Sequence, residues 1–301
     1  MTSQSRRVRS KLARPDTKLV YGPDILARSL SVATVADKFG NRWQYHSRSD
    51  QHSKIACWAL LFDLLQHCPL LIQHIRLKKI GFGINHEMRD FRNNRSKDLD
   101  LVVCTPGQAA ISDSITFRAL RDQYRVVLLP HEEELLAAMP ELDRVSVGTV
   151  HIALEAKAAM TEHIKALPRL FDELNSSHQA IHGSAEFAIA AGFAVVNYST
   201  TFVSSDRNKR DLADADAIVT QHAQPKATER TIKKLEEIPR RTREGAEGFD
   251  ALGIVVLDLA NDGSRVSVVT EPPAPSYADV WHYDQMVRRI ASLYSNKFAN
   301  I

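Results

Sequence analysis

The segments Ser96-Lys-Asp-Leu-Asp-Leu-Val-Val103 and Val150-His-Ile-Ala-Leu-Glu-Ala-Lys157 decide the expected fold of this 301-residue chain. Each segment is an apolar run of strand length with acidic side chains at one end. Because side chains alternate across a strand, Glu155 and Lys157 project from one face, and the alanine between them projects from the other. A carboxylate and an amine are therefore expected side by side at the edge of a sheet, where both are solvent-accessible.

The elements around these two strands predict an α/β protein with a mixed central β-sheet flanked by helices. Apolar residues recur at helical spacing over 53–77, and Pro69 breaks this helix. The other elements expected are a strand at 80–84, a polar loop through 97, short helices within 112–140, helical segments across 161–191, a strand at 193–203, a hairpin at 253–269 and a closing helix at 276–296 with Ser276 as its N-cap.

Composition is that of an ordinary soluble globular protein, with 44% apolar and 25% charged residues. No apolar run reaches the roughly 18 to 20 residues that a membrane span needs, so no membrane insertion is expected. The three cysteines are scattered and odd in number, which argues for a reducing compartment and against a disulfide framework. A cytoplasmic location is expected.

The distribution of charge is more informative than the net charge of +3. Residues 1–20 are expected to form a basic, flexible arm, and 21–301 a single domain with a highly charged, helical insertion around 206–248. Basic residues also concentrate at 76–79, 89–97 and 226–243. Such clusters could follow a phosphate backbone, although each one taken alone is more often a solvated surface.

The chemistry suggested by the two strands is phosphodiester hydrolysis. Asp100 opens the first strand, and if the strands are neighbours, Asp100 and Glu155 can share one hard cation. Two carboxylates and several waters form the oxygen-only site that suits Mg²⁺. A lysine beside them can orient or deprotonate the attacking water, or stabilise the transition state.

An Asp that opens an apolar strand, followed by Glu-x-Lys at the end of another, resembles the signature of the PD-(D/E)xK nuclease superfamily, which includes many type II restriction endonucleases. The resemblance implies a restriction-endonuclease-like core in which Asp100, Glu155 and the Ala156 carbonyl bind Mg²⁺, with Mn²⁺ as a possible substitute. It also implies that Lys157 is the catalytic lysine. The chain departs from the pattern in having Leu99 in place of a proline and in needing an insertion at about 106–145.

Other residues are candidates for the same site. Asp98 lies on the same face as Asp100, which we prefer because it directly abuts the apolar run. The superfamily often adds an acid from a preceding helix, for which Asp63 of the long helix and Glu87 of the loop that follows it are candidates, although a plain surface role fits either residue equally well. Possible DNA contacts are Thr161, His163, Lys165, Arg92, Arg95 and Lys97; for 161–165, a helix N-cap with exposed charges is an equal alternative.

The expected function is a Mg²⁺-dependent DNA endonuclease, and within the resemblance a sequence-specific type II restriction endonuclease of a prokaryotic cell. Its partner would be double-stranded DNA, and reading a palindrome calls for a homodimer. Nucleotide-binding glycine motifs are absent from the sequence, so no nucleotide cofactor is expected. The alternatives are a repair, recombination or mobile-element nuclease, and a DNA-binding protein without catalytic activity.

Overall fold

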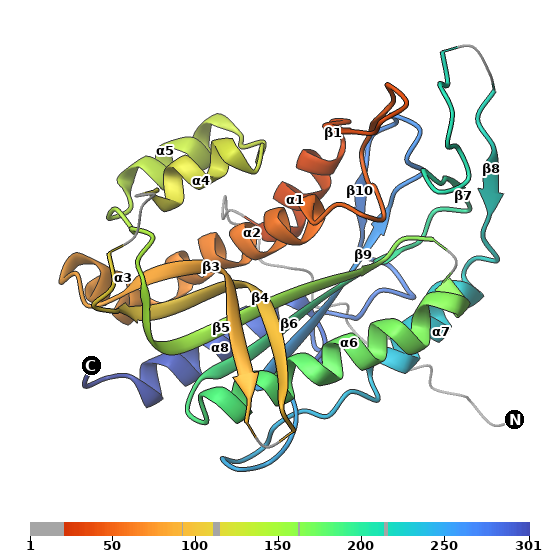
Figure 1. The fold of residues 1–301 in the computed structure, drawn as a ribbon. Coiled ribbons are helices and arrows are strands. Elements are labelled where there is room, and N and C mark those ends of the chain that lie inside the picture. Colours follow the sequence, from red (N-terminus) through yellow and green to blue (C-terminus); the bar gives the residue numbers. More distant parts are fainter. Residues whose placement is uncertain (1–20, 92, 111–114, 162, 214–215) are drawn as a thin grey trace, which may run out of the picture.

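The computed structural model describes residues 21–301 except 92, 111–114, 162 and 214–215 (Figure 1). The expected basic arm at 1–20 and the candidate Arg92 lie outside the described residues, as does the side chain of Lys165. The helices are α1 (Gly22–Leu30), α2 (Gln51–His67), α3 (Pro69–Arg76), α4 (Phe117–Gln123), α5 (Pro130–Ala138), α6 (His163–Ser184), α7 (Lys226–Leu235) and α8 (Tyr283–Lys297). The strands are β1 (Val35–Ala36), β2 (Arg42–Trp43), β3 (Gly81–Asp90), β4 (Arg95–Pro106), β5 (Val147–Ala159), β6 (Ile189–Asn197), β7 (Thr201–Val203), β8 (Val219–Gln221), β9 (Ala251–Asp258) and β10 (Ser267–Val269).

A six-stranded mixed sheet forms the centre of the molecule, in the order β10-β9-β6-β5-β4-β3. Its three middle strands, β5, β6 and β9, are parallel, and the remaining neighbours are antiparallel. Of these, β6 and β9 are almost continuously apolar, as expected for strands that are covered on both faces. The expected mixed sheet flanked by helices is therefore present, and α4 and α5 fill the expected insertion between β4 and β5.

Helices cover both faces of this sheet. α1, α2 and α8 pack on one face, and α6 and α7 pack on the other (Figure 1). A separate apolar core lies on each side: Trp58, Phe62 and Ile290 belong to the first, and Leu174, Ile181 and Phe249 to the second. Most of α2 is buried, because the helix is covered by the sheet below and by α1 and α8 beside it.

Three expected boundaries were wrong. The polar segment at 85–97 is not a loop, because Glu87 and Asp90 continue the β3–β4 ladder to Asp98 and Arg95. The charged segment at 206–248 contains only one helix, α7, among its described residues. The closing helix begins at Tyr283, because the preceding backbone bonds to β9: the Ile254 amide donates to the Trp281 carbonyl at 2.8 Å.

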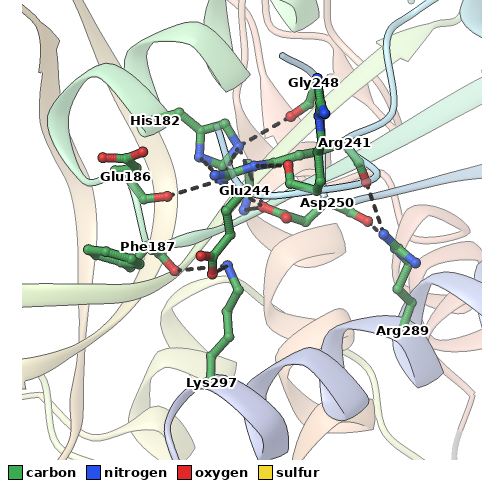
Figure 2. Close-up of polar contacts among 11 residues, drawn as sticks. His182, Glu186, Phe187, Arg241, Glu244, Gly248, Asp250, Arg289 and Lys297 are labelled. Atoms are coloured by element: carbon green, nitrogen blue, oxygen red, sulfur yellow. Dashed lines mark hydrogen bonds and ion pairs between the residues drawn. The ribbon is translucent and has the colours of Figure 1, made fainter. Parts of the chain in front are cut away.

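A buried polar cluster connects the loop between α7 and β9 to the C-terminal end of α6 and to α8 (Figure 2). Arg241, 3% exposed, donates from Nη1 to Nδ1 of His182 at 2.8 Å and to the Glu186 carbonyl at 3.0 Å. Asp250 Oδ2 lies 4.0 Å from the same Nη1. Arg289 of α8 donates to the Arg241 carbonyl at 3.0 Å and also to the Asp250 carbonyl. The cluster thus joins the end of α6, the loop and α8.

Within the described part of the chain, no single helix is long and apolar enough to cross a bilayer. The pair α2 and α3 has the necessary length and composition only when taken together, and the two helices meet at 97°.

The Arg241 cluster is expected to contribute strongly to stability. Arg241→Met keeps most of the apolar stem but leaves Asp250 and two hydrogen-bond acceptors without their buried donor, which costs about 3 kcal/mol. The measurement is the free energy of unfolding in urea. The control is Arg243→Met in the same loop, where the side chain is exposed and the change is expected to be below about 0.5 kcal/mol. Equal stabilities of the two variants would contradict this role of Arg241.

The buried histidine of β5 is expected to make folding pH-dependent. His151 is the extra residue of a β-bulge, since Ile152 pairs with Val103 and Val150 pairs with Cys104. It is 3% exposed, packs against the Phe298 ring at 4.6 Å, and neither ring nitrogen has a hydrogen-bond partner among the described residues. Burial lowers the pKa of His151 to about 4, and the neighbouring His74 adds to this shift.

The unfolded chain therefore binds a proton at this histidine below about pH 6.5, while the folded chain resists it until about pH 4. The free energy of unfolding is therefore unaffected by His151 above pH 6.5, where the ring is neutral in both states. It decreases as the pH falls from 6.5 towards 4. His151→Leu removes this loss, so the stability of the variant relative to wild type should increase from pH 7.5 to pH 5. Urea unfolding of both proteins at the two pH values tests this, and a constant difference would contradict it.

Candidate active site

The two acid-bearing strands part at the point where their acids lie. β4 and β5 are paired only as far as Leu101 and Leu154, while β4 continues beyond this point with β3 alone. Beyond this point the Ala156 amide of β5, which is directed toward β4, donates to Oδ2 of Asp100 at 2.9 Å instead of to the β4 backbone. We call the space between residues 97–100 of β4 and 155–157 of β5 the fork.

Helix α2 forms one wall of the fork and holds Asp100 in place. Ser53 in its first turn donates from Oγ to Oδ1 of Asp100 at 3.0 Å. Cys57, one turn further along the same face, places Sγ 3.9 Å from Oδ2. With the Ala156 amide on Oδ2, both oxygens of Asp100 are contacted, so the carboxylate has a fixed orientation.

Glu155 projects into the fork and is 1% exposed. Lys157 Nζ lies 2.8 Å from Oε1 of Glu155, and Lys97 Nζ lies 3.9 Å from the same oxygen. Neither oxygen has a hydrogen bond of acceptable geometry within the described part of the chain. The expectation that Glu155 is solvent-accessible was wrong: the residue is buried in a strand against which both α2 and α6 pack. The Lys157 side chain, 26% exposed, does reach the surface.

Burial dominates the electrostatics of the fork. It raises the pKa of Glu155 to about 7, and the negative charge of Asp100 contributes, while Lys157 and Lys97 act in the opposite direction. Burial also raises the pKa of Asp100, against the lowering effect of the Ala156 amide. For Lys157, burial alone would lower the pKa, but Glu155 and Asp100 outweigh it and the net shift is upward. Each of the two carboxyl groups makes ionisation of the other less favourable. A nearby cation would stabilise the ionised form of both.

The donor atoms in the fork fit a hard divalent cation. Glu155 offers Oε2, which has no hydrogen bond among the described residues, and Oε1, which Lys157 approaches to 2.8 Å, and the charge of Asp100 acts on the same carboxyl. The N–H and C=O of one residue in an extended strand point to the same side, so the Ala156 carbonyl also points into the fork. The described residues contain no group of three His, Cys, Asp or Glu side chains arranged to hold a metal ion. Waters would complete the shell, as is usual for Mg²⁺.

The side chains of the other candidate acids do not join Asp100 and Glu155 in the fork. Asp98 is exposed and faces Glu87 across the β3–β4 ladder. Asp63 is 2% exposed and accepts a hydrogen bond from the Gly22 amide at 2.8 Å, so it holds the start of α1. It also lies about 15 Å along α2 from Ser53, given the helical rise per residue. Of the acids considered, the structure brings together only Asp100 and Glu155.

Two of the candidate DNA contacts border a surface hollow of about 660 Å³ beside the fork. This hollow, which we call the α6 hollow, lies between the β3–β4 hairpin and α6 and is lined by Arg95, Ser96, Lys97, Arg169, Asp172, Glu173, Ser176 and Ala180. His163 is 3% exposed, and its Nε2 hydrogen-bonds to the Asn197 carbonyl at 2.7 Å, so the ring is not presented to the surface. Thr161 Oγ1 is buried without a partner among the described residues.

Sequence reasoning missed several residues of the fork. Ser53 and Cys57 carry no motif, and their spacing of four only says that they share a helix face. His52 lies at the start of α2, and burial together with the positive charge of Lys157 lowers its pKa to about 4. Glu173 of α6 accepts a hydrogen bond from Lys97 through its backbone carbonyl at 3.3 Å. The sequence contains no local signal for these contacts, because each depends on how a helix packs on the sheet.

Removing the buried charge of Glu155 is expected to stabilise the metal-free protein. Because its pKa is raised to about 7, stability is greatest below about pH 4.5 and is lost as the pH rises through 7. Glu155→Gln abolishes this loss and should increase the free energy of unfolding at pH 8 by on the order of 1 kcal/mol. The gain should shrink at pH 5. Urea unfolding with a chelator present tests this, and a variant less stable than wild type at pH 8 would contradict it.

Comparisons of the chain with protein-family models, with curated proteins and with solved structures found no match.

Proposed function

We propose that this protein is a Mg²⁺-dependent DNA endonuclease whose active site is the fork. The observation that carries the proposal is the convergence of Asp100, Glu155 and Lys157 at the parting of two strands, with the Glu155 carboxylate buried and its Oε1 2.8 Å from Lys157 Nζ. Such an arrangement is costly in a protein without a cation, and perturbed ionisable groups of this kind cluster at functional sites. It also agrees with the proposed restriction-endonuclease-like core.

The residues of the fork have distinct roles in this proposal. Asp100, fixed by Ser53 and the Ala156 amide, and Glu155 would hold the ion. A bound Mg²⁺ supplies a water of lowered pKa and neutralises charge on the phosphate. Lys157 lies 2.8 Å from Glu155 and is 26% exposed, so its ammonium reaches both the carboxylate and a phosphate that approaches from the surface. There it orients the attacking water and stabilises the charge that develops.

Double-stranded DNA is the proposed substrate, and sequence-specific cleavage as a homodimer is the proposed mode. The basic side chains of Arg95, Lys97 and Arg169 border the α6 hollow next to the fork, where they can contact phosphates on either side of the scissile bond. These contacts give affinity without sequence preference. Discrete fragments from plasmid DNA would favour restriction-type cleavage, and a smear or a preference for branched DNA would favour a repair or recombination nuclease.

The experiment is cleavage of plasmid DNA by the purified full chain with Mg²⁺. Asp100→Asn removes a charged ligand and Lys157→Met removes the ammonium while keeping the stem, and each is expected to lose activity by about a hundredfold or more. Asp98→Asn is the matched control, because it makes the same change two residues away on an exposed position of β4. It should keep activity within about threefold, as expected for a residue outside the chemistry.

Three results would count against the proposal. These are cleavage that continues in excess chelator, wild-type cleavage by a correctly folded Lys157→Met protein, and an equal defect in the Asp98→Asn control. Circular dichroism of each variant separates loss of activity from loss of fold.

A further inference from the structure

Lys97 is a second cationic residue of the fork. Its Nζ lies 3.9 Å from Oε1 of Glu155, the oxygen that Lys157 approaches to 2.8 Å. A hydrogen bond of 3.3 Å to the Glu173 carbonyl holds the Lys97 ammonium at this place, and its side chain is 21% exposed. Sequence reasoning assigned Lys97 only a possible DNA contact, whereas the structure places it against the buried carboxylate.

We propose that the fork binds one divalent ion per chain and that the ammonium of Lys97 takes the place of a second one. The proposal rests on the proposed metal-dependent function and specifies how the fork is loaded. It depends on two independent observations, the charge balance of the fork and its small number of acidic ligands.

The charge balance limits how many ions the fork accepts. Ionised Asp100 and Glu155 carry two negative charges, and Lys97 and Lys157 carry two positive ones. The four groups are therefore neutral together, and one divalent ion already leaves a surplus of two positive charges. A phosphodiester compensates one of them. A second divalent ion would lie within a few ångströms of both ammonium groups, where screening by solvent is weak because Glu155 is 1% exposed.

The small number of acidic side chains in the fork also indicates a single metal ion. Two-metal phosphodiesterase sites hold two ions about 4 Å apart, and each ion needs carboxylates of its own in addition to any that bridge. The described residues provide no group of three His, Cys, Asp or Glu side chains that could hold even one ion by side chains alone. The side chains of Asp98, Glu87 and Asp63 do not join Asp100 and Glu155 in the fork, as described above.

Lys97 also lies where a substrate phosphate would arrive. The residue lines both the fork and the α6 hollow, whose other basic side chains are Arg95 and Arg169. A phosphodiester that enters the fork from this hollow would meet Lys97 beside Glu155. An ammonium at this position supplies a fixed positive charge and hydrogen-bond donors to phosphate oxygens, two of the tasks of a second metal ion.

The test is to count bound Mn²⁺ by electron paramagnetic resonance of the free ion, using the full chain without DNA. Wild type is expected to bind one ion per chain. Lys97→Met keeps the stem and removes the charge that competes with the ion for Glu155, so Mn²⁺ affinity should rise by about tenfold. DNA cleavage should fall in the same variant. Tighter metal binding together with weaker cleavage is not expected from a general disturbance of the fold.

Lys78→Met is the matched control, because Lys78 also forms an ion pair, with Asp143 at 2.8 Å, but lies in the turn between α3 and β3. It should change neither Mn²⁺ affinity nor cleavage. Two ions per wild-type chain, or unchanged Mn²⁺ affinity in Lys97→Met, would overturn this inference and leave the proposed metal-dependent nuclease standing. No bound ion in wild type would overturn the metal site itself, and both proposals with it.

Discussion

The hydrogen bond from the Ala156 amide to the Asp100 carboxylate is the interaction on which the site depends. Two strands of a sheet cannot part without leaving backbone donors and acceptors unpaired, and such groups are costly when buried. Here a side chain of one strand takes the place of its own backbone in the ladder. The parting is thereby stabilised, Asp100 is oriented by the same bond, and Glu155 and Lys157 gain the space into which they project.

This arrangement places charge where a folded protein least tolerates it. Glu155 is almost completely buried beside the carboxylate of Asp100. The ammonium groups of Lys157 and Lys97 lie near its Oε1 but do not replace full hydration. The stability to hold it there comes from elsewhere: an apolar core on each face of the sheet, and the Arg241 cluster at the C-terminal end of α6. Functional sites commonly break the rules of packing and charge that the remainder of the fold obeys.

Sequence periodicity predicted the elements of the site better than their surroundings. Alternation and apolar length identified the strands of Asp100 and Glu155, because a strand's two faces are visible in its own residues. The burial of Glu155 was missed because it depends on helices distant in the sequence, α2 and α6, that pack against β5. The same limit applies to Ser53, whose contact with Asp100 requires the packing angle of a helix. Asp63 was considered as a ligand, although its partner is the start of α1.

The position of α8 has a consequence for synthesis of the chain. This helix covers β9 and β6 and packs against α2, and its Arg289 completes the Arg241 cluster. When the ribosome has synthesised the chain only through β9, the three parallel strands β5, β6 and β9 are complete. Helix α8, which covers β9 and β6, is still missing. Such an intermediate exposes a broad apolar face, and contacts between segments so distant in sequence form slowly.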